Sequence, residues 1–121
     1  MKVVDLKLPV PPTLNHFYRR NGKRVFRSKE YNEFLWSVAE EWARKRIDDW
    51  YFDTSYDVRI LLFFPTRRRY DIDNRVKPIL DALTRAGVWK DDVLVNRIVV
   101  ERGDVDKENP RSEVRIIAFR E

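Results

Sequence analysis

Apolar and polar residues alternate in several short stretches of the chain, as they do in strands that bury one face against a core. In the first stretch Val4, Leu6 and Leu8 share a face, and prolines from Pro9 onward stop the strand. An Asn-Gly pair between aromatic residues indicates a short hairpin. The pattern therefore predicts strands at residues 3–8, 58–64, 93–102 and 112–119, with the hairpin turn at 21–22.

Two other segments have the spacing of amphipathic helices. The first follows Ser28, a good N-cap, and should end near Ile47. The second begins near Asp73 and should stop at Gly87, while Pro78 predicts a slight kink or a late start. The apolar stripe of the first helix is Tyr31, Phe34, Leu35, Val38 and Trp42.

The order strand, hairpin, helix, strand, helix, strand, strand predicts an α/β (α+β) fold, a mixed sheet with two main helices. At 121 residues the chain fits a single two-layer domain over residues 1–121. Trp36, Trp42 and Trp50 are interpreted as core or interface residues, and Trp89 as the anchor of its loop.

Composition and charge narrow the classes of protein. The sequence has no run of 18 apolar residues, no secretory signal and no cysteine, so we expect a cytoplasmic protein without disulfides or thiolate metal sites. The single histidine, His16, disfavours histidine-based catalysis. Twenty-five Lys and Arg against 20 Asp and Glu give a net charge of +5, which suits a polyanionic partner such as nucleic acid.

The densest polar feature is Arg67-Arg68-Arg69-Tyr70-Asp71-Ile72-Asp73-Asn74, with Lys77 after it and Asp91-Asp92 further on. Side chains two residues apart in extended chain project alike, so Asp71 and Asp73 would face one way. Hard cations such as Mg²⁺ prefer carboxylate oxygens, and Asp92 would complete the ligand set. Such ions activate water for attack on a phosphodiester, while Lys77 neutralises phosphate charge.

The same residues also have ordinary structural interpretations. Asp73 is a competent N-cap, and Asp73, Lys77 and Asp81 have the spacing of an ion-pair row along a helix. Asp91-Asp92 can be turn residues before a strand. An Asp-X-Asp pattern by itself is weak evidence for metal-dependent catalysis.

The order of these motifs resembles the RusA family of Holliday junction resolvases. The resemblance rests on Asp71-Ile72-Asp73-Asn74, Lys77, the Asp81-Ala82-Leu83 helix, Trp89-Lys90-Asp91-Asp92, and the N-terminal Leu8-Pro9-Val10-Pro11-Pro12 with Asn15 and Tyr18-Arg19. It runs from about residue 5 to residue 102. It implies a small homodimeric, Mg²⁺-dependent endonuclease that cuts four-way DNA junctions symmetrically. Its metal and catalytic aspartates match Asp71, Asp73 and Asp92, and its catalytic lysine matches Lys77.

Basic residues elsewhere predict contacts with the DNA backbone, a salt-sensitive interaction without sequence preference. In the hairpin, Phe17 and Tyr18 are candidates for stacking on exposed bases, or for packing beneath the hairpin. The alternative for the cations is a solubilising loop. The predicted contacts are Arg19, Arg20, Lys23, Arg24 and Arg27 in the hairpin, and Arg67, Arg68 and Arg69 before the acids.

The aspartates need not meet within one chain. A helix over 74–86 is roughly 18 Å long, and the five residues from Gly87 to Asp91 span at most about 17 Å. Asp92 of one subunit is therefore hypothesised to complete the site begun by Asp71 and Asp73 of the other. The alternatives to a resolvase are a non-catalytic protein that binds branched DNA and a Mg²⁺-dependent nuclease acting on another nucleic acid.

Overall fold

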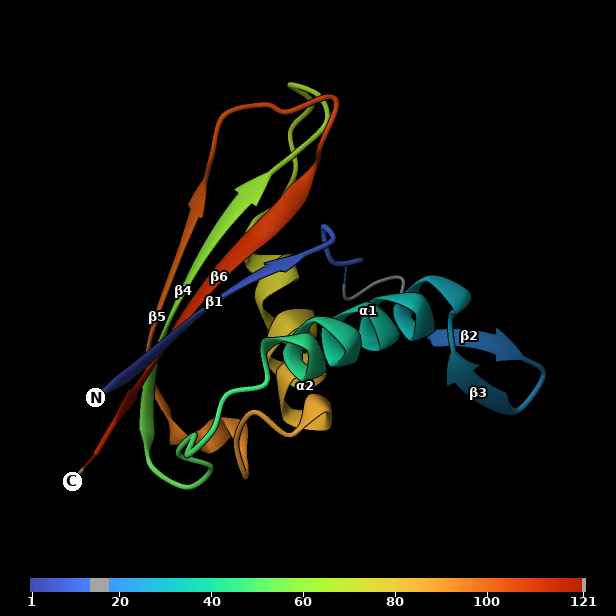
Figure 1. Ribbon diagram of the computed structural model, residues 1–121. Helices are drawn as coiled ribbons and strands as arrows, with labels where there is room; N and C mark the ends of the chain where they lie inside the picture. Colours follow the sequence, from blue (N-terminus) through green and yellow to red (C-terminus); the bar gives the residue numbers. More distant parts are fainter. Residues whose placement is uncertain (14–17, 121) are drawn as a thin grey trace.

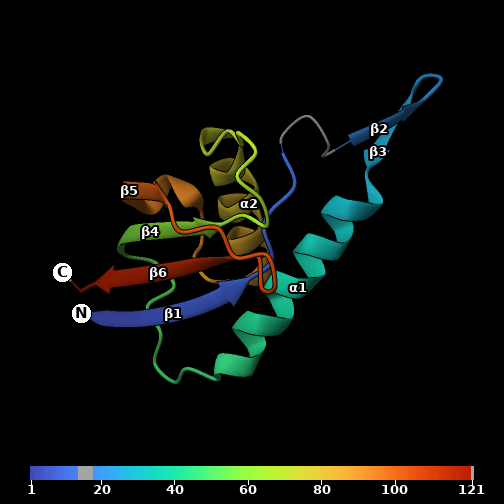
Figure 2. The same cartoon turned by 90° about the horizontal axis from the view of Figure 1, so that it is seen from above.

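Two helices lie on one side of a curved four-stranded sheet, and a small hairpin projects beyond the start of the first helix (Figures 1 and 2). The computed structural model describes residues 1–13 and 18–120, apart from the side chains of residues 18, 19, 21 and 24–26. Because both helices cover the same face, the molecule has the two layers that the sequence predicts.

The sheet has the strand order β1-β6-β4-β5. Strands β4 and β5 run parallel, whereas β6 pairs antiparallel with both β1 and β4. The predicted mixed sheet is therefore confirmed. The strands are β1 (Lys2–Leu8), β4 (Ser55–Phe63), β5 (Val95–Arg102) and β6 (Arg111–Phe119). The hairpin is a separate two-stranded sheet of β2 (Tyr18–Asn21) and β3 (Arg24–Arg27), and Gly22 in its turn has a φ of 63°.

Helix α1 (Lys29–Lys45) packs one face on the sheet. The Tyr31 amide donates to Ser28 Oγ over 3.2 Å, so the predicted N-cap is confirmed. The helix ends two residues before Ile47, where Arg46 adopts a left-handed φ of 47°. Its predicted stripe faces the core, but Trp36 is 68% exposed, so the core interpretation of Trp36 is wrong.

Helix α2 (Val76–Ala86) starts late, as Pro78 predicts, after the 3₁₀ turn η2 (Asp73–Arg75). Pro78 occupies the third position of the α-helix, where a missing amide hydrogen costs little. At the other end Gly87 has a φ of 88° and donates its amide to the Thr84 carbonyl, an arrangement that favours glycine. Among the described residues, no helix is long and apolar enough to span a membrane.

Glu41 joins α1 to the edge strand β1 from a nearly buried position. Its Oε2 accepts the Lys7 amide over 2.8 Å, and its Oε1 accepts from Arg44. Burial works to raise the pKa of Glu41, but the bonds from Lys7 and Arg44 outweigh it and hold the pKa below the ordinary value of 4.5. This carboxylate therefore satisfies an edge-strand amide that β1 cannot pair with another strand.

We expect Glu41→Gln to lower the free energy of unfolding at neutral pH by about 1.5–3 kcal/mol, because it removes hydrogen bonds to a charged group. A carboxyl with a depressed pKa stabilises the fold above its unfolded pKa and loses that effect as the pH falls through its folded pKa. The difference between the two proteins should therefore narrow below a pH of 4.5. Urea unfolding of both proteins over a range of pH measures this difference in the free energy of unfolding.

The matched control is Glu40→Gln on the neighbouring, exposed position. It should change stability little at any pH. A Glu41→Gln deficit that stays constant into the acid range would show that the carboxylate charge is not what stabilises this contact.

Candidate active site

Asp71 and Asp73 lie on the segment that leads from the end of β4 into η2, and both side chains are exposed. Ile72 between them is half-buried against the core, so the two carboxylates project outward. Neither makes a hydrogen bond or ion pair with a residue that the structure describes. Asp73 is the first residue of η2 and provides no side-chain cap, so the N-cap interpretation is wrong.

Lys77, at the second position of α2, joins two other carboxylates. Its Nζ lies 3.1 Å from Asp81 Oδ1 and 3.2 Å from Asp92 Oδ2. Hydrogen bonds to Asp81 and then to Asp92 raise the pKa of Lys77, so the ammonium stays charged at neutral pH. The ion-pair row along the helix thus forms from Lys77 to Asp81, and Asp73 takes no part in it.

The segment after α2 places Asp92 beside Lys77. Trp89 is 1% exposed and donates its Nε1 to Thr84 Oγ1 over 2.7 Å, while Trp50 Nε1 donates to the Val88 carbonyl over 2.8 Å. Asp91 caps the short 3₁₀ turn η3 (Asp92–Leu94) by accepting the Val93 amide over 3.0 Å. Trp89 therefore anchors this loop, as the sequence indicates, and of the two acids Asp91 has the turn role.

The three predicted aspartates do not form one cluster within the chain. Among the residues that the structure describes, no three His, Cys, Asp or Glu side chains are grouped closely enough to hold a metal ion. The donor chemistry of Asp71 and Asp73 nevertheless fits Mg²⁺, which commonly takes one or two carboxylates and fills its remaining positions with water and phosphate oxygens. Two accessible carboxylates without hydrogen-bond partners among the described residues suit such an ion.

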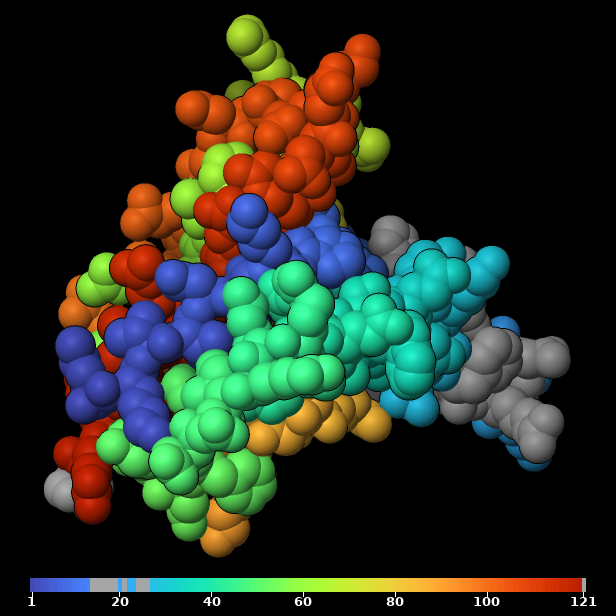
Figure 3. Space-filling model, in the orientation of Figure 1, coloured from blue at the N-terminus to red at the C-terminus, as the bar shows by residue number. Residues whose placement is uncertain are grey.

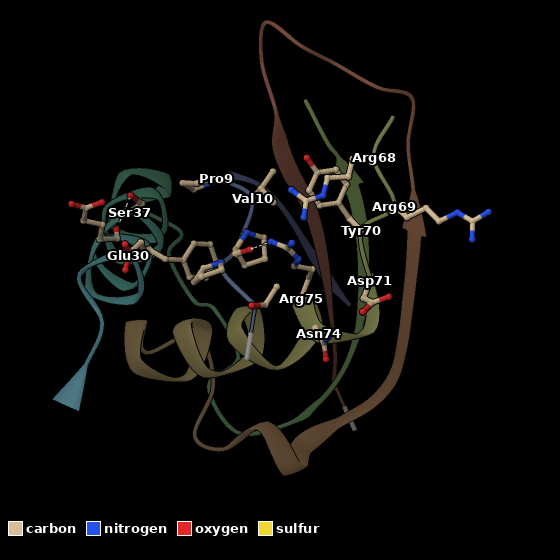
Figure 4. Close-up of a pocket in the computed structure, with 15 residues that line it drawn as sticks. Pro9, Val10, Glu30, Ser37, Arg68, Arg69, Tyr70, Asp71, Asn74 and Arg75 are labelled. Atoms are coloured by element: carbon tan, nitrogen blue, oxygen red, sulfur yellow. Dashed lines mark hydrogen bonds between the residues drawn. The ribbon is translucent and has the colours of Figure 1, made fainter. Parts of the chain in front are cut away.

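A groove of about 840 Å³ runs past Asp71 (Figure 4). One wall is the start of α1, one is the proline-rich segment after β1, and one is the segment of residues 68–75. Figure 4 shows Arg68 beside Tyr70, whereas the Arg69 side chain points away from the groove. The groove thus carries acidic and basic groups close together, with Asp71 at its edge.

Of the predicted DNA-binding arginines, Arg68 and Arg69 lie along this groove. Arg67, Arg68 and Arg69 are exposed on the segment that, with the turn before β6, forms the tip at the top of Figure 3. In the hairpin the side chains of Arg20, Lys23 and Arg27 are exposed. The side chains of Arg19 and Arg24 lie outside the described part of the structure, as do Asn15, His16, Phe17 and the Tyr18 side chain.

Sequence reasoning missed Arg75 and the aromatic pair Phe64–Tyr70, which lie against the Asp71 segment. The two rings stack with centroids 4.2 Å apart and planes 2° from parallel, and the Arg75 guanidinium contacts both. Phe64 and Tyr70 are six residues apart, a spacing that belongs to no regular element. Only the turn between them brings the rings together.

The α+β scaffold thus carries exposed carboxylates, a charged lysine and a groove lined by acids and arginines, which are the groups that metal-assisted phosphodiester-cleaving enzymes use. Comparison with known proteins agrees: the family model "Endodeoxyribonuclease RusA" matches residues 9–117. The chain belongs to the RusA family of endodeoxyribonucleases. The match runs past residue 102 into β6, further than the sequence motifs indicate.

Several curated proteins are similar to this chain. The crossover junction endodeoxyribonucleases RusA of Escherichia coli K12 and of Enterobacteria phage 82 are each 37% identical over 95 residues. The protein of the same name from Shigella sonnei is 36% identical over 95 residues. Each alignment covers 78% of this chain and 78% of the relative.

Proposed function

We propose that this protein is a Mg²⁺-dependent, structure-selective endonuclease that resolves four-way (Holliday) DNA junctions by paired, symmetric cuts in DNA recombination and repair. The observation that carries the proposal is the exposed Asp71–Asp73 pair, with Asp71 at the edge of a groove that Arg68 and Arg75 also line, in a chain of the RusA family. Nucleases of this family generally use a divalent metal ion, and the carboxylate donors favour Mg²⁺.

Asp71 and Asp73 are the residues that would hold the metal ion. When bound there, the ion supplies a Lewis acid and an activated water for phosphodiester hydrolysis. The Lys77 ammonium stays protonated because its pKa is raised, and it provides positive charge for the phosphate that becomes more negative during cleavage. Asp92, which contacts Lys77 in this structure, would be the third acidic ligand.

Two basic surfaces would hold the DNA backbone on either side of these acids. One is the hairpin with Arg19, Arg20, Lys23, Arg24 and Arg27, and the other is the segment with Arg67, Arg68 and Arg69. Contacts of this kind orient the substrate without reading its sequence. The substrate is therefore expected to be chosen by its branched shape.

A cleavage assay on a synthetic four-way junction tests the proposal. Nicking should require a divalent ion, with Mg²⁺ sufficient, and should be far weaker on linear duplex and on single strands. Binding without nicking under every metal condition would favour a non-catalytic branched-DNA-binding protein. Equal cleavage of all three substrates would favour a nuclease without junction selectivity.

We expect Asp71→Asn, Asp73→Asn and Asp92→Asn each to abolish junction cleavage while junction binding stays near normal or becomes tighter. Each change removes a metal ligand, and it also removes a negative charge that faces the phosphates. Single-turnover cleavage at saturating Mg²⁺ and a gel-shift titration without metal measure the two effects.

Asp91→Asn is the matched control, because asparagine can still accept the Val93 amide and Asp91 is outside the proposed ligand set. This control should cleave normally. Near-normal cleavage by any of the three ligand variants at saturating Mg²⁺ would remove that residue from the essential ligands.

Replacing Arg67, Arg68 and Arg69 together by alanine should weaken binding to all junction sequences alike and flatten its dependence on salt. Fewer phosphate contacts release fewer counterions, so log affinity falls less steeply against log salt concentration. Fluorescence anisotropy titrations at several salt concentrations give the slope.

The control carries the same loss of charge outside the groove: Lys45, Arg59 and Arg97 changed together to alanine. These exposed residues lie at the end of α1, on β4 and on β5, and none of them lines the groove beside Asp71. An equal change of slope in both triple variants would mean that net charge, and not local phosphate contact, sets the affinity.

Paired symmetric cuts require two sites, so we propose a homodimer in which the metal site is shared between subunits. What supports this arrangement is that Asp71, Asp73 and Asp92 of one chain are not grouped closely enough to hold a metal ion. Two-fold symmetry of the dimer then matches the two-fold symmetry of the junction.

Mixing Asp73→Asn and Asp92→Asn proteins tests the shared site. In a mixed dimer one of the two sites would then carry all its aspartates, so junction nicking should reappear after subunit exchange. Mass spectrometry verifies the mixed dimers. Verified mixed dimers that remain inactive would place the complete set of aspartates in one chain.

A further inference from the structure

The aromatic pair Phe64–Tyr70 closes the loop that carries the three arginines. Phe64, just after β4, is 2% exposed, and Tyr70 directly precedes Asp71. Their rings stack in parallel, and the hydroxyls of Thr66 and Tyr70 lie 3.0 Å apart. The stack therefore ties the residue before Asp71 to the core of the protein.

Arg75, the last residue of η2, contacts the same pair, although it follows Asp71 and Asp73 in the sequence and the two rings precede them. Its guanidinium carbon lies 5.5 Å from the Phe64 ring centroid and 5.7 Å from that of Tyr70, so it contacts both rings. Its Nη1 donates to the Pro11 carbonyl over 2.5 Å. Arg75 thus connects three separate segments: the proline-rich segment, the aromatic pair and the start of α2.

Arg102, at the end of β5, holds Tyr70 by its backbone. Its Nη2 donates to the Tyr70 carbonyl over 2.5 Å, and its guanidinium carbon lies 5.6 Å from the Phe64 ring centroid. Tyr70 is therefore fixed through both its ring and its carbonyl. We call Phe64, Tyr70, Arg75 and Arg102 the aromatic clamp.

Stability alone is a poor explanation for Arg75 in the clamp. Its Nε is enclosed and has no hydrogen-bond acceptor among the described residues, which commonly costs about 1–3 kcal/mol. Burial lowers the pKa of Arg75, while Tyr70 and Asp71 act in the opposite direction. The positive charge is thus held in a partly buried place, where it and the Asp71 carboxylate attract each other.

We propose that Tyr70 and Arg75 are positioning residues that hold Asp71 and Asp73 in the geometry needed to bind the metal ion. Tyr70 fixes the chain immediately before Asp71, and Arg75 fixes it two residues after Asp73. Ile72 adds a core contact between them. The inference rests on the proposed function, because it assigns to these residues the support of its metal ligands.

The residues of the aromatic clamp are different from the proposed metal ligands, so the two roles can be tested separately. Neither Tyr70 nor Arg75 offers a carboxylate, the side-chain group that Mg²⁺ prefers. Residues that orient metal ligands commonly change metal affinity by about 10- to 100-fold when they are removed. Loss of the clamp should therefore weaken metal binding while the carboxylates themselves remain.

The test compares four variants of the full-length protein. Tyr70→Ala removes the stacked ring, and Arg75→Met keeps an apolar stem without the guanidinium. Tyr70→Phe is the matched control, because it keeps the ring and loses only the hydroxyl beside Thr66. Arg75→Lys keeps a cation without the planar fork, and it remains informative if Arg75→Met folds poorly.

Two readouts separate positioning from general stability. Hydrogen–deuterium exchange over residues 66–73, without metal or DNA, reports how firmly the segment is held. The Mg²⁺ concentration for half-maximal junction cleavage reports the metal site, with junction affinity in EDTA and the melting temperature measured alongside. Tyr70→Ala and Arg75→Met should exchange faster and need about 10- to 100-fold more Mg²⁺. Tyr70→Phe should match the wild type in both readouts. Arg75→Lys should lie between the wild type and Arg75→Met in both.

Each outcome decides the inference. Unchanged exchange in both Tyr70→Ala and Arg75→Met would show that no clamp exists. Faster exchange with an unchanged Mg²⁺ requirement, or a loss confined to junction affinity, would overturn the positioning role. A wild-type protein that cleaves under no metal condition would overturn the proposed function and this role with it, while the exchange data would still show whether the clamp holds the segment.

Discussion

The parallel pairing of β4 with β5 is the constraint on which the site depends. Parallel neighbours need a connection that returns the chain to the opposite end of the sheet, and α2 makes that return. The Asp71 segment must therefore lie where the chain leaves β4, and Asp92 must lie where it enters β5. The connection thus separates the acids along the chain, with Asp71 and Asp73 before α2 and Asp92 after it.

Side-chain reach partly closes this separation. The Lys77 side chain extends along α2 to Asp81, and Asp92 meets it there because two tryptophans fasten the preceding loop. The backbone lengths alone indicate that Asp92 barely reaches the start of the helix. They leave out the long side chain of Lys77, which extends to meet Asp92. The result is a lysine shared by two acids, next to two acids without hydrogen-bond partners among the described residues.

Charge is arranged around the groove in a way that suits a polyanion. Exposed carboxylates repel phosphates, so a DNA-cutting site needs cations beside its acids. Here three arginines come before Asp71 in the sequence, and Arg75, which comes after it, contacts the aromatic pair. The aromatic rings give these cations a fixed partner that does not neutralise them, because attraction to a ring leaves the full charge in place.

The sequence by itself determined the elements and their order. Alternation and helical spacing depend on neighbours along the chain. The strands, the Ser28 cap and the Gly87 stop can therefore be predicted from the sequence. The solvent exposure of Trp36 and the shorter end of α1 depended on packing. Only the tertiary structure decided that Lys77 contacts Asp92 and that Arg75 joins Pro11 to the Phe64–Tyr70 pair. These contacts link residues from different elements, and no periodicity along a chain records which separate elements meet in space.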